Sequence, residues 1–436
     1  MTSVRALSLE AIEAVFKDGA FSNLKINEVL NRETLSATDR GLLTVLVYGT
    51  IQHKLTLDYY LKPFIKTKIK GWVRRLLWMS LYQFIYMDKI PTHAIINEAV
   101  VLAKKRGGQQ TGNTVNAILR RVTTEDLLDV TAIKDDIKRL SIQYSMPLWI
   151  VKHWKTHFGV EITEEILKAM QTPVSQTVRV NRTKLSVDSA VHYLESEGYT
   201  VNKDAHIDEC LHVSNGPIIA SALFKEGKIS IQDKSSMFVA KILNPERQDG
   251  VLDCCSAPGG KACHVAELLE NTGHVDATDI HAHKIALIEQ NIKKLALKNI
   301  SASVHDASTP YTKKYDKIIV DAPCSGLGVL RHKPEIKYMM SEAQVASLVD
   351  VQLKILENVT QSLKEGGTLV YSTCTIEQME NENVIYTFLK AHPDFEFEPF
   401  NNPVNGNKTH TLQLLPQDLN TDGFFITKIK RKERLK

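Results

Sequence analysis

The residues VLDCCSAPGGKA, numbered 251–262, run from a strand pattern through two glycines into a helical pattern. Gly259 and Gly260 allow the backbone to turn tightly and to approach a bound molecule closely. The start of the following helix offers free N–H groups and the positive end of its dipole, which suit an anionic group. The GxGxxG spacing is absent and Pro258 lies in the loop, so the pattern disfavours a nicotinamide or flavin cofactor.

Strand and helix patterns alternate around this stretch from about residue 228 onward. Strands are expected at 250–254, 274–278, 302–304, 317–320 and 368–372, and helices at 261–269, 283–295, 342–363 and 380–391. Alternation of this kind is typical of a doubly wound, mostly parallel sheet with helices on both faces. We therefore expect an α/β, Rossmann-like domain over 228–436.

Two aspartates follow the glycine loop at the ends of predicted strands. Asp279 ends the strand after the loop and lies 19 residues beyond Gly260, about where an acidic group would hold a pair of ribose hydroxyls. Asp306 ends the third strand, where it could accept a hydrogen bond from an adenine amino group. Either aspartate alone would be read as a helix cap. Together with the loop, they favour a ligand with an adenosine moiety.

Two cysteines follow the fourth and fifth predicted strands, in DAPCSGLGVL (321–330) and STCTIEQMENE (372–382). Open α/β sheets bind ligands at the carboxyl ends of their strands. If these two strands are neighbours, Cys324, Cys374 and Asp321 face one pocket. A lone cysteine is more often a small buried apolar residue than a nucleophile, and that is the expectation for Cys210, Cys254 and Cys263.

The chain before residue 228 has a different pattern. Apolar residues recur at helical spacing through residues 1–140, interrupted at Gly107–Gly108, and predict a small all-α bundle. Residues 141–227 combine a helical pattern at 148–158 with short strand patterns and predict a small α+β subdomain. With the catalytic region over 228–436, we expect three domains.

Charge is unevenly distributed along the chain. Residues 1–140 hold 21 Lys and Arg against 14 Asp and Glu, a balance of +7, whereas the remainder balances at −3. A basic region suits a polyanion, because lysine and arginine neutralise phosphates and release counterions. A solvated basic surface is an equally good interpretation of the charge alone.

Composition narrows the class of protein further. Hydrophobic residues make up 43% and charged residues 24% of the 436, which is ordinary for a globular protein. No apolar run is long enough to span a bilayer, and residues 1–10 lack the features of a secretion signal. The six cysteines show neither a disulfide framework nor zinc spacing. We expect a cytoplasmic protein with reduced thiols, no metal and no membrane partner.

The motifs LDCCSAPGGK (252–261), DAPCSGLG (321–328) and STCT (372–375) resemble those of class I S-adenosylmethionine-dependent RNA cytosine-C5 methyltransferases. The layout of nearly the whole chain is similar to the bacterial RsmB family (also called Sun or Fmu), which methylates a cytosine of 16S ribosomal RNA. The N-terminal third resembles NusB, an RNA-binding antitermination factor. SIQDKSSM (230–237), RHKPEIK (331–337) and DGFF (422–425) are also similar to the family.

The resemblance implies a role for each motif residue. The methionine end of S-adenosylmethionine would be lined by Cys255, Ser256, Ala257, Pro258, Gly259, Gly260 and Lys261. Asp279 would bind its ribose, Asp306 its adenine, and Asp321 would lie between cofactor and base. Cys374 would be the nucleophile, and Cys324 would help to release the product. DNA cytosine-C5 enzymes instead use the cysteine of a PC motif as nucleophile, so the two thiol roles need testing.

The chemistry of cytosine explains why such a site needs a thiol. Carbon C5 is a poor nucleophile, and a thiolate that adds to C6 makes C5 enamine-like and able to attack an electrophilic methyl group. A carboxyl group near N3 favours the addition, and the target base has to be single-stranded or flipped out of a helix. We expect 16S ribosomal RNA rather than DNA as the partner. Two alternatives stay open: a tRNA cytosine substrate, and a non-catalytic RNA-binding or ribosome assembly factor.

Overall fold

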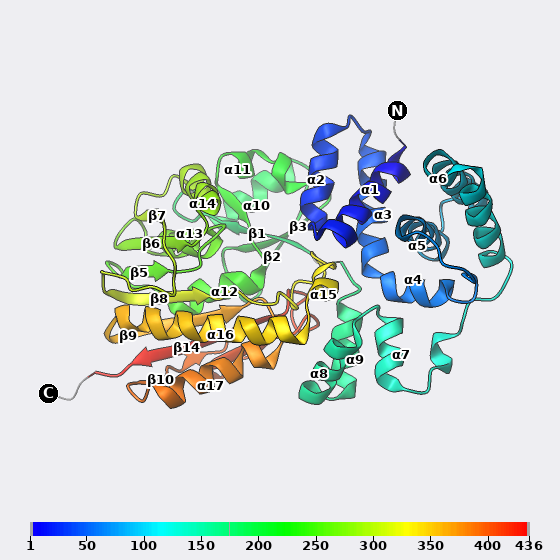
Figure 1. The fold of residues 1–436 in the computed structure, drawn as a ribbon. Helices are drawn as coiled ribbons and strands as arrows, with labels where there is room; N and C mark the ends of the chain where they lie inside the picture. Colours follow the sequence, from blue (N-terminus) through cyan, green and yellow to red (C-terminus); the bar gives the residue numbers. More distant parts are fainter. Residues whose placement is uncertain (1–2, 174, 434–436) are drawn as a thin grey trace. The chain divides into compact units, whose positions relative to one another are not determined.

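The computed structural model describes residues 3–173 and 175–433 (Figure 1). The chain divides into two compact units. One runs from the N-terminus to Thr172 and includes Leu330–Met340, and we call it the helical unit. The other comprises Pro173–Val329 and the chain from Ser341 onward, and we call it the sheet unit. The three predicted domain ranges, with boundaries after residues 140 and 227, remain a prediction.

The described part of the helical unit contains helices and loops but no strand, as its apolar spacing predicts. Leu7, Ala11 and Val15 recur on one face of the first helix and are buried in the core of this unit. Ser3 caps that helix by accepting a hydrogen bond from the Ala6 N–H. The helices are α1 Val4–Asp18, α2 Ser22–Arg32, α3 Ala37–Gln52, α4 Lys54–Leu61, α5 Gly71–Tyr86, α6 Thr92–Val122, α7 Asp136–Gln143, α8 Leu148–Phe158 and α9 Val160–Ala169.

The predicted interruption at Gly107–Gly108 is a kink within α6. Gly108 has φ 81° and ψ 176°, outside the helical region, while helical structure continues on both sides of it to Val122. A positive φ is sterically accessible to glycine at low cost. The short helix expected around residues 115–122 is therefore the second arm of a kinked helix.

The segment Leu330–Met340 carries a short helix, α15 (Ile336–Met339), that belongs to the helical unit. Tyr338 and Met339 pack against the core of that unit. The buried carboxylate of Glu335 accepts hydrogen bonds from the N–H and the hydroxyl of Ser22, at 3.0 and 2.7 Å. Sequence alone gave no sign that residues just beyond the DAPC motif would join the helical unit.

The helix expected at 148–158 is α8 and belongs to the helical unit, so the predicted α+β range of 141–227 divides between the two units. The sheet unit contains a small antiparallel sheet, with three of its four strands inside that range. Its strands lie in the order β2-β3-β1-β4, and α10 (Val187–Ser196) packs with them around a core that includes Val178, Leu194 and Leu211. The strands are β1 Gln176–Val180, β2 Thr200–Lys203, β3 Cys210–Ser214 and β4 Ile229–Ile231, and the short helix α11 (Ala222–Lys225) precedes β4.

The large sheet confirms the predicted doubly wound architecture. Five parallel strands lie in the order β9-β8-β5-β6-β7, so the chain order reverses between β5 and β8. The strands are β5 Gly250–Asp253, β6 His274–Asp279, β7 Ile300–Val304, β8 Tyr315–Asp321 and β9 Leu363–Thr373. Apolar cores cover both faces, formed with α12 Lys234–Leu243, α13 Gly260–Leu268 and α14 Ala282–Leu295 on one side and α16 Glu342–Val359 and α17 Glu382–Ala391 on the other.

The C-terminal strands extend this sheet in the antiparallel sense and are absent from the sequence prediction. β14 (Phe424–Arg431) pairs antiparallel with β9, and β10 (Phe395–Phe397) and β13 (Thr411–Leu414) pair with β14. The pairing β11 (Phe400–Asn401) with β12 (Lys408–Thr409) forms a separate hairpin. The residues of β14 alternate between Ile and Lys near its end, a pattern that indicates a strand.

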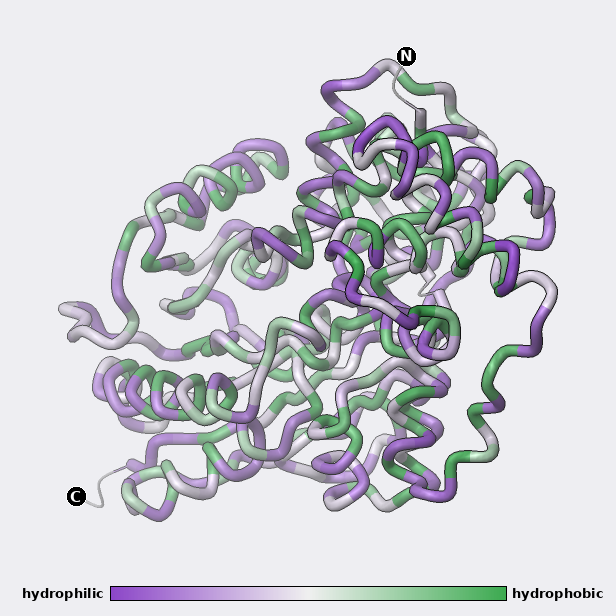
Figure 2. The backbone as a smooth tube through the Cα atoms, turned by 45° about the vertical axis from the view of Figure 1, so that its right-hand side comes forward, coloured by the Kyte–Doolittle hydropathy of each residue, from purple (hydrophilic) through white to green (hydrophobic). Residues whose placement is uncertain are grey.

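Hydrophobic and hydrophilic residues are mixed along the helices, as Figure 2 shows. This mixing fits helices that bury one face and expose the other. None of the described helices is long and apolar enough to cross a membrane.

Candidate active site

The loop after β5 has the conformation that its two glycines allow. Gly259 has φ 96°, in the left-handed region, and α13 begins at Gly260 directly after it. A Cβ at Gly259 would also lie 3.0 Å from Cγ2 of Ile288 in α14. Backbone angle and close packing therefore both favour glycine at this position. The turn leaves the N-terminus of α13 at the carboxyl edge of the parallel strands.

A cavity of about 550 Å³ lies at that edge of the sheet. Its walls come from the segments that follow the five parallel strands and from α16. The lining residues are Cys254, Cys255, Ala257, Asp279, Ile280, His281, Lys284, Asp306, Ala307, Ser308, Asp321, Ala322, Pro323, Cys324, Val351, Lys354, Ile355 and Cys374. This volume lies within the range of about 300–1,000 Å³ typical of small-molecule sites.

The cavity brings together seven of the candidate residues: Cys255, Ala257, Asp279, Asp306, Asp321, Cys324 and Cys374. Ser256, Pro258, Gly259, Gly260 and Lys261 belong to the same loop and helix start but are not among its lining residues. Ser256 is buried, and its N–H donates to the Thr278 carbonyl across to β6. The binding roles of all these residues remain predictions.

The two aspartates of the predicted adenosine site lie on the cavity wall. Asp279 is 6% exposed, and its Oδ1 accepts a hydrogen bond of 3.0 Å from the His281 N–H. Asp306 follows β7 by two residues instead of ending it, and its Oδ1 accepts from the Ser308 N–H at 2.9 Å. That backbone hydrogen bond lowers the pKa of Asp306 and keeps it an acceptor.

Lys261 reaches from the loop to Asp321 at the end of β8. Its Nζ lies 2.8 Å from Oδ2 of Asp321, and the Ser372 hydroxyl donates to Oδ1 at 2.8 Å. Burial disfavours the ammonium, but the Asp321 carboxylate outweighs it and holds the pKa of Lys261 above its usual value. The site therefore contains a charged lysine–aspartate pair beside the two thiols.

Asp253, the last residue of β5, is fully buried and close to this pair. No hydrogen bond to either of its carboxyl oxygens is present among residues 3–173 and 175–433. Burial, and then the charge of Asp321, raise the pKa of Asp253 to about 7. Asp253 can therefore hold a proton near neutral pH, unlike an ordinary aspartate.

The two cysteines are held side by side by neighbouring parallel strands. Asp321 of β8 is in register with Ser372 of β9, and Sγ of Cys324 lies 3.3 Å from Sγ of Cys374. The hydrogen bond between the thiols and burial raise the pKa of Cys324 well above its usual value. Cys324 therefore keeps its proton at neutral pH and can donate it toward the sulfur of Cys374.

Comparison with protein families matches each part of the chain. The model for the 16S rRNA methyltransferase RsmB/F matches residues 240–430, the NusB family model matches residues 2–124, and the ferredoxin-like domain of RsmF/B-like methyltransferases matches residues 146–219. A probable ribosomal RNA small subunit methyltransferase B from Bacillus subtilis is 42% identical over 99% of both chains. This chain belongs to the ribosomal RNA small subunit methyltransferase B family.

Further members of the family and solved structures agree with this result. The probable methyltransferase B of Synechocystis is 31% identical over 99% of this chain and 100% of its own. The crystal structure of PH0851 superposes with a TM-score of 0.84 and 25% identity over 98% of each chain. A methyltransferase homologue from Pyrococcus horikoshii gives a TM-score of 0.60 with 28% identity, over 69% of this chain and all of its own.

Sequence reasoning about this RsmB-family chain missed Glu380, which supports both cysteine loops. Its buried Oε1 accepts from the Ser325 N–H at 2.8 Å and from Nε2 of Gln352 at 3.1 Å, and its Oε2 binds the Ser325 hydroxyl. Gln352 also donates to the Pro323 carbonyl at 3.0 Å. Glu380 lies within the quoted 372–382 stretch, but a glutamate so close to a helix start is ordinarily a solvated residue.

Three arginines of the N-terminal third have acidic partners. Their guanidinium groups form the ion pairs Arg74–Asp58, Arg106–Glu13 and Arg121–Glu125. Arg106 also lies over the ring of Trp72, with 4.7 Å to the ring centroid. The balance of +7 already counts these three acidic partners, so the ion pairs leave that net charge unchanged.

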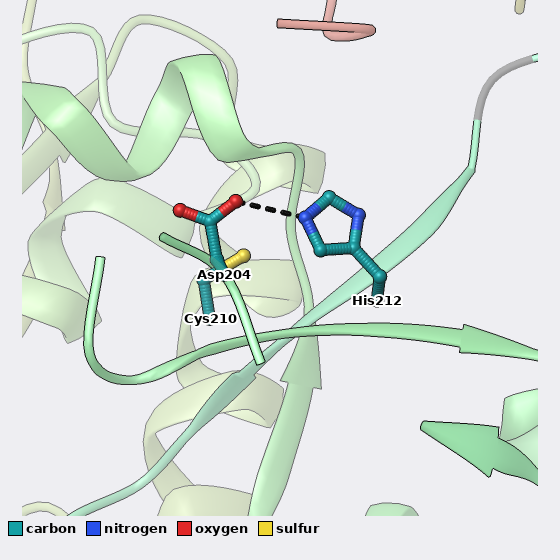
Figure 3. Close-up of side chains that lie close together, drawn as sticks. All are labelled: Asp204, Cys210 and His212. Carbon is teal, nitrogen blue, oxygen red and sulfur yellow. Dashed lines mark hydrogen bonds and ion pairs between the residues drawn. The ribbon is translucent and has the colours of Figure 1, made fainter. Parts of the chain in front are cut away.

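A second cluster in the sheet unit, Asp204, Cys210 and His212, has ligand atoms within 4.8 Å of one another (Figure 3). Its charge is already balanced, because Nζ of Lys234 lies 2.6 Å from the Asp204 carboxylate, which His212 also contacts at 2.8 Å. Despite burial, His212 and Lys234 hold the pKa of Asp204 well below its usual range. We interpret the cluster as an ion-pair network in the core, with Cys210 buried as predicted.

Proposed function

We propose that this chain transfers the methyl group of S-adenosylmethionine to C5 of a cytosine in 16S ribosomal RNA, through a covalent bond between Cys374 and C6. The observation that carries the proposal is the meeting of Cys374, Cys324 and Asp321 in one cavity, with Asp321 paired to Lys261. The 42% identity to a probable ribosomal RNA small subunit methyltransferase B supports the substrate class.

The cavity suits S-adenosylmethionine. Asp279 and Asp306 offer acceptors for ribose hydroxyls and an adenine amino group, and the glycine loop exposes backbone N–H groups for the methionine end. NSun6 from Pyrococcus horikoshii, whose structure includes SFG, an S-adenosylmethionine analogue, has a similar fold with a TM-score of 0.59. When bound, S-adenosylmethionine supplies an electrophilic methyl group.

The two thiols have different roles in the proposed reaction. Cys324 keeps its proton, and Cys374 is the nucleophile, whose sulfur adds to C6 while electron density moves to C5. In the proposed reaction Asp321, held by Lys261 and Ser372, interacts with N3 of the base. After C5 has gained the methyl group, a base takes the C5 proton and the S–C6 bond breaks. The Cys324 S–H then stabilises the departing thiolate.

We further propose that residues 1–140 bind RNA and that the protein acts in the cytoplasm. The match of the NusB family model to residues 2–124 supports the first point, and the +7 charge of that region fits it. A tRNA substrate and a purely structural role in ribosome assembly are the competing functions.

The test uses the wild type, Cys374→Ala and Cys324→Ala with protein-free small-subunit rRNA and methyl-labelled S-adenosylmethionine. Label in the RNA and protein–RNA adducts on a denaturing gel are measured. Wild type should label cytosine C5, Cys374→Ala should give neither label nor adduct, and Cys324→Ala should accumulate adducts. Cys263→Ala, a substitution of a buried thiol inside α13, is the matched control and should behave as wild type.

Other outcomes would contradict the thiol roles, the RNA substrate or the enzymatic function. Adducts trapped by Cys374→Ala and lost in Cys324→Ala would exchange the two thiol roles. In a parallel reaction with tRNA, label in the tRNA combined with none in the rRNA would support a tRNA substrate. A wild type that neither labels RNA nor binds S-adenosylmethionine would leave the assembly-factor function.

A further inference from the structure

The two active-site sulfurs are held close together by the backbone. Cys324 follows β8 by three residues, and Cys374 follows β9 directly. The Ala322 N–H donates to the Ser372 carbonyl at 2.9 Å, and the Gly328 N–H donates to the Cys374 carbonyl at 3.0 Å. The 3.3 Å separation of the sulfurs is thus built into two adjacent strand ends.

We propose that Cys324 and Cys374 form a reversible intramolecular disulfide under oxidising conditions, and that this bond switches the active site off. A disulfide needs a sulfur separation of about 2.05 Å, so the side chains have to close by about 1.3 Å from the observed contact. Rotation about the side-chain torsions of both cysteines can supply this movement. A bond here would occupy the sulfur that the proposed function assigns to nucleophilic attack.

The oxidant is a peroxide, and the reaction balances without any other reagent. The Cys374 thiolate attacks hydrogen peroxide, the O–O bond breaks, and a sulfenic acid forms as the released hydroxide takes up a proton. The Cys324 sulfur then attacks the Cys374 sulfur, an S–S bond forms, and water leaves with the Cys324 proton. Overall, two thiols lose two electrons and two protons, and one peroxide becomes two waters.

The other four cysteines are poorer candidates for this chemistry. Cys210 and Cys263 are fully buried, so their sulfurs are shielded from an oxidant in the solvent. Cys254 and Cys255 are sequence neighbours with sulfurs 3.9 Å apart, and Cys254 is 1% exposed. Cys324 and Cys374, by contrast, are both partly exposed and both line the cavity, so a small oxidant can reach them.

A disulfide would also protect the nucleophile. A lone sulfenic acid can be oxidised further to a sulfinic acid, a change that is irreversible for most proteins, whereas a disulfide returns to two thiols with a reductant. Cys324 lies in position to capture the sulfenic acid first. The loss of activity rests on the proposed function of Cys374, but formation of the disulfide does not.

The experiment treats the full-length protein with hydrogen peroxide, blocks remaining thiols, and maps cysteine-linked peptides by mass spectrometry. A peptide pair joining Cys324 to Cys374, lighter by two hydrogen atoms, is expected. Methyl transfer should fall at least about tenfold in parallel and recover with dithiothreitol. Cys263→Ala should match wild type, while Cys324→Ser should instead carry sulfinic acid on Cys374 that dithiothreitol does not reverse.

Each alternative result has a defined meaning. Sulfenic or sulfinic acid on Cys374 of the wild type without the linked peptide would overturn the proposal, as would a link between Cys254 and Cys255 alone. A Cys324–Cys374 link that leaves methyl transfer unchanged would keep the disulfide, but it would reject both the switch and the assignment of Cys374 as nucleophile.

Discussion

The two units each bury a lysine, but the two ammonium groups have opposite electrostatic surroundings. Lys261 in the sheet unit faces the Asp321 carboxylate, and its pKa is raised despite burial. Lys337 in the helical unit is fully buried and donates to neutral oxygens of Gln52, the backbone O at 2.9 Å and Oε1 at 3.1 Å. Burial lowers the pKa of Lys337 to about 7.

The difference shows what a buried lysine needs in order to remain a cation. Neutral oxygens accept its hydrogen bonds but do not offset the loss of hydration, whereas a carboxylate also supplies the opposite charge. Lys261 therefore stays charged beside Asp321, and Lys337 attaches α15 to Gln52 through hydrogen bonds. Four substitutions test the difference between the surroundings of Lys261 and those of α15.

The largest effect is expected for Asp321→Asn. This change keeps the shape of the side chain but removes the charge that faces Lys261 and the proposed contact with the base. Methyl transfer should fall by about 10²–10⁴-fold in kcat, the range for loss of a group that assists proton movement. Asp316→Asn at the opposite end of β8 is the control and should stay within a few-fold of wild type. Equal losses in both variants would mean that damage to the strand, not the site, explains the result.

Lys261→Met should cost stability as well as activity. Removal of the ammonium leaves Asp321 without its ion-pair partner and Asp253 without a nearby cation. The free energy of unfolding of the sheet unit should fall by about 1–3 kcal/mol, as for other partly buried charges left unpaired. Urea unfolding followed by circular dichroism measures this change. A variant as stable as wild type would show that the ion pair contributes nothing to the fold.

Lys337→Met should change the pH dependence of stability. In the unfolded chain Lys337 keeps its proton up to the ordinary lysine pKa, whereas in the folded state it releases the proton near pH 7. Between these values the unfolded state binds more protons, so stability from this group rises with pH, by up to about 1.4 kcal/mol per unit. Below pH 7 both states carry the proton and the penalty is constant.

The measurement compares urea unfolding of wild type and Lys337→Met from pH 7 to 9. Groups that titrate equally in both proteins cancel in the difference. The nearby His53, whose pKa is lowered to about 4 by burial and then by Lys337, stays neutral over this range. The gain in stability with pH should be smaller in Lys337→Met, and identical slopes would contradict a lowered pKa of Lys337.

The smallest effect is expected for Glu335→Gln. The residue at the N-cap of α2 is Phe21, whose side chain cannot accept a hydrogen bond, and Glu335 takes over that function through Ser22. A glutamine keeps one acceptor oxygen but loses the negative charge at the helix N-terminus, which costs about 1 kcal/mol. Thermal unfolding of the helical unit measures the change. Glu28→Gln, an exposed residue of the same helix, should have no comparable effect.

Local patterns in the sequence were enough to predict the catalytic fold and the edge where its site lies. The strand–glycine loop–helix unit at 251–262 forms as predicted, because glycine adopts the left-handed backbone angle of Gly259 at low cost. Cys324, Cys374 and Asp321 could be placed at one sheet edge, because residues that follow parallel strands share that edge. Each of these two predictions depends only on a few consecutive residues and on the spacing of apolar residues around them.

Contacts between segments distant in the sequence could not be predicted in the same way. The Lys261–Asp321 pair spans 60 residues, and Glu335 caps a helix 313 residues away. Which carboxylate meets which ammonium depends on the order of the strands and on the loops that bring the two together. The spacing of hydrophobic residues does not predict these contacts. It indicates which face of a helix or strand is buried, but not which other segment packs against that face.

The properties of the candidate site thus depend on both the local sequence and the tertiary structure. Residue types and their short spacings specify the thiols, the carboxylates and the turn that holds them. Folding of the whole chain sets the 3.3 Å between the sulfurs, the protonation of Asp253 and the opposite pKa shifts of Lys261 and Lys337. Burial and the distance between charges are properties of the packed molecule, and a pKa responds to both.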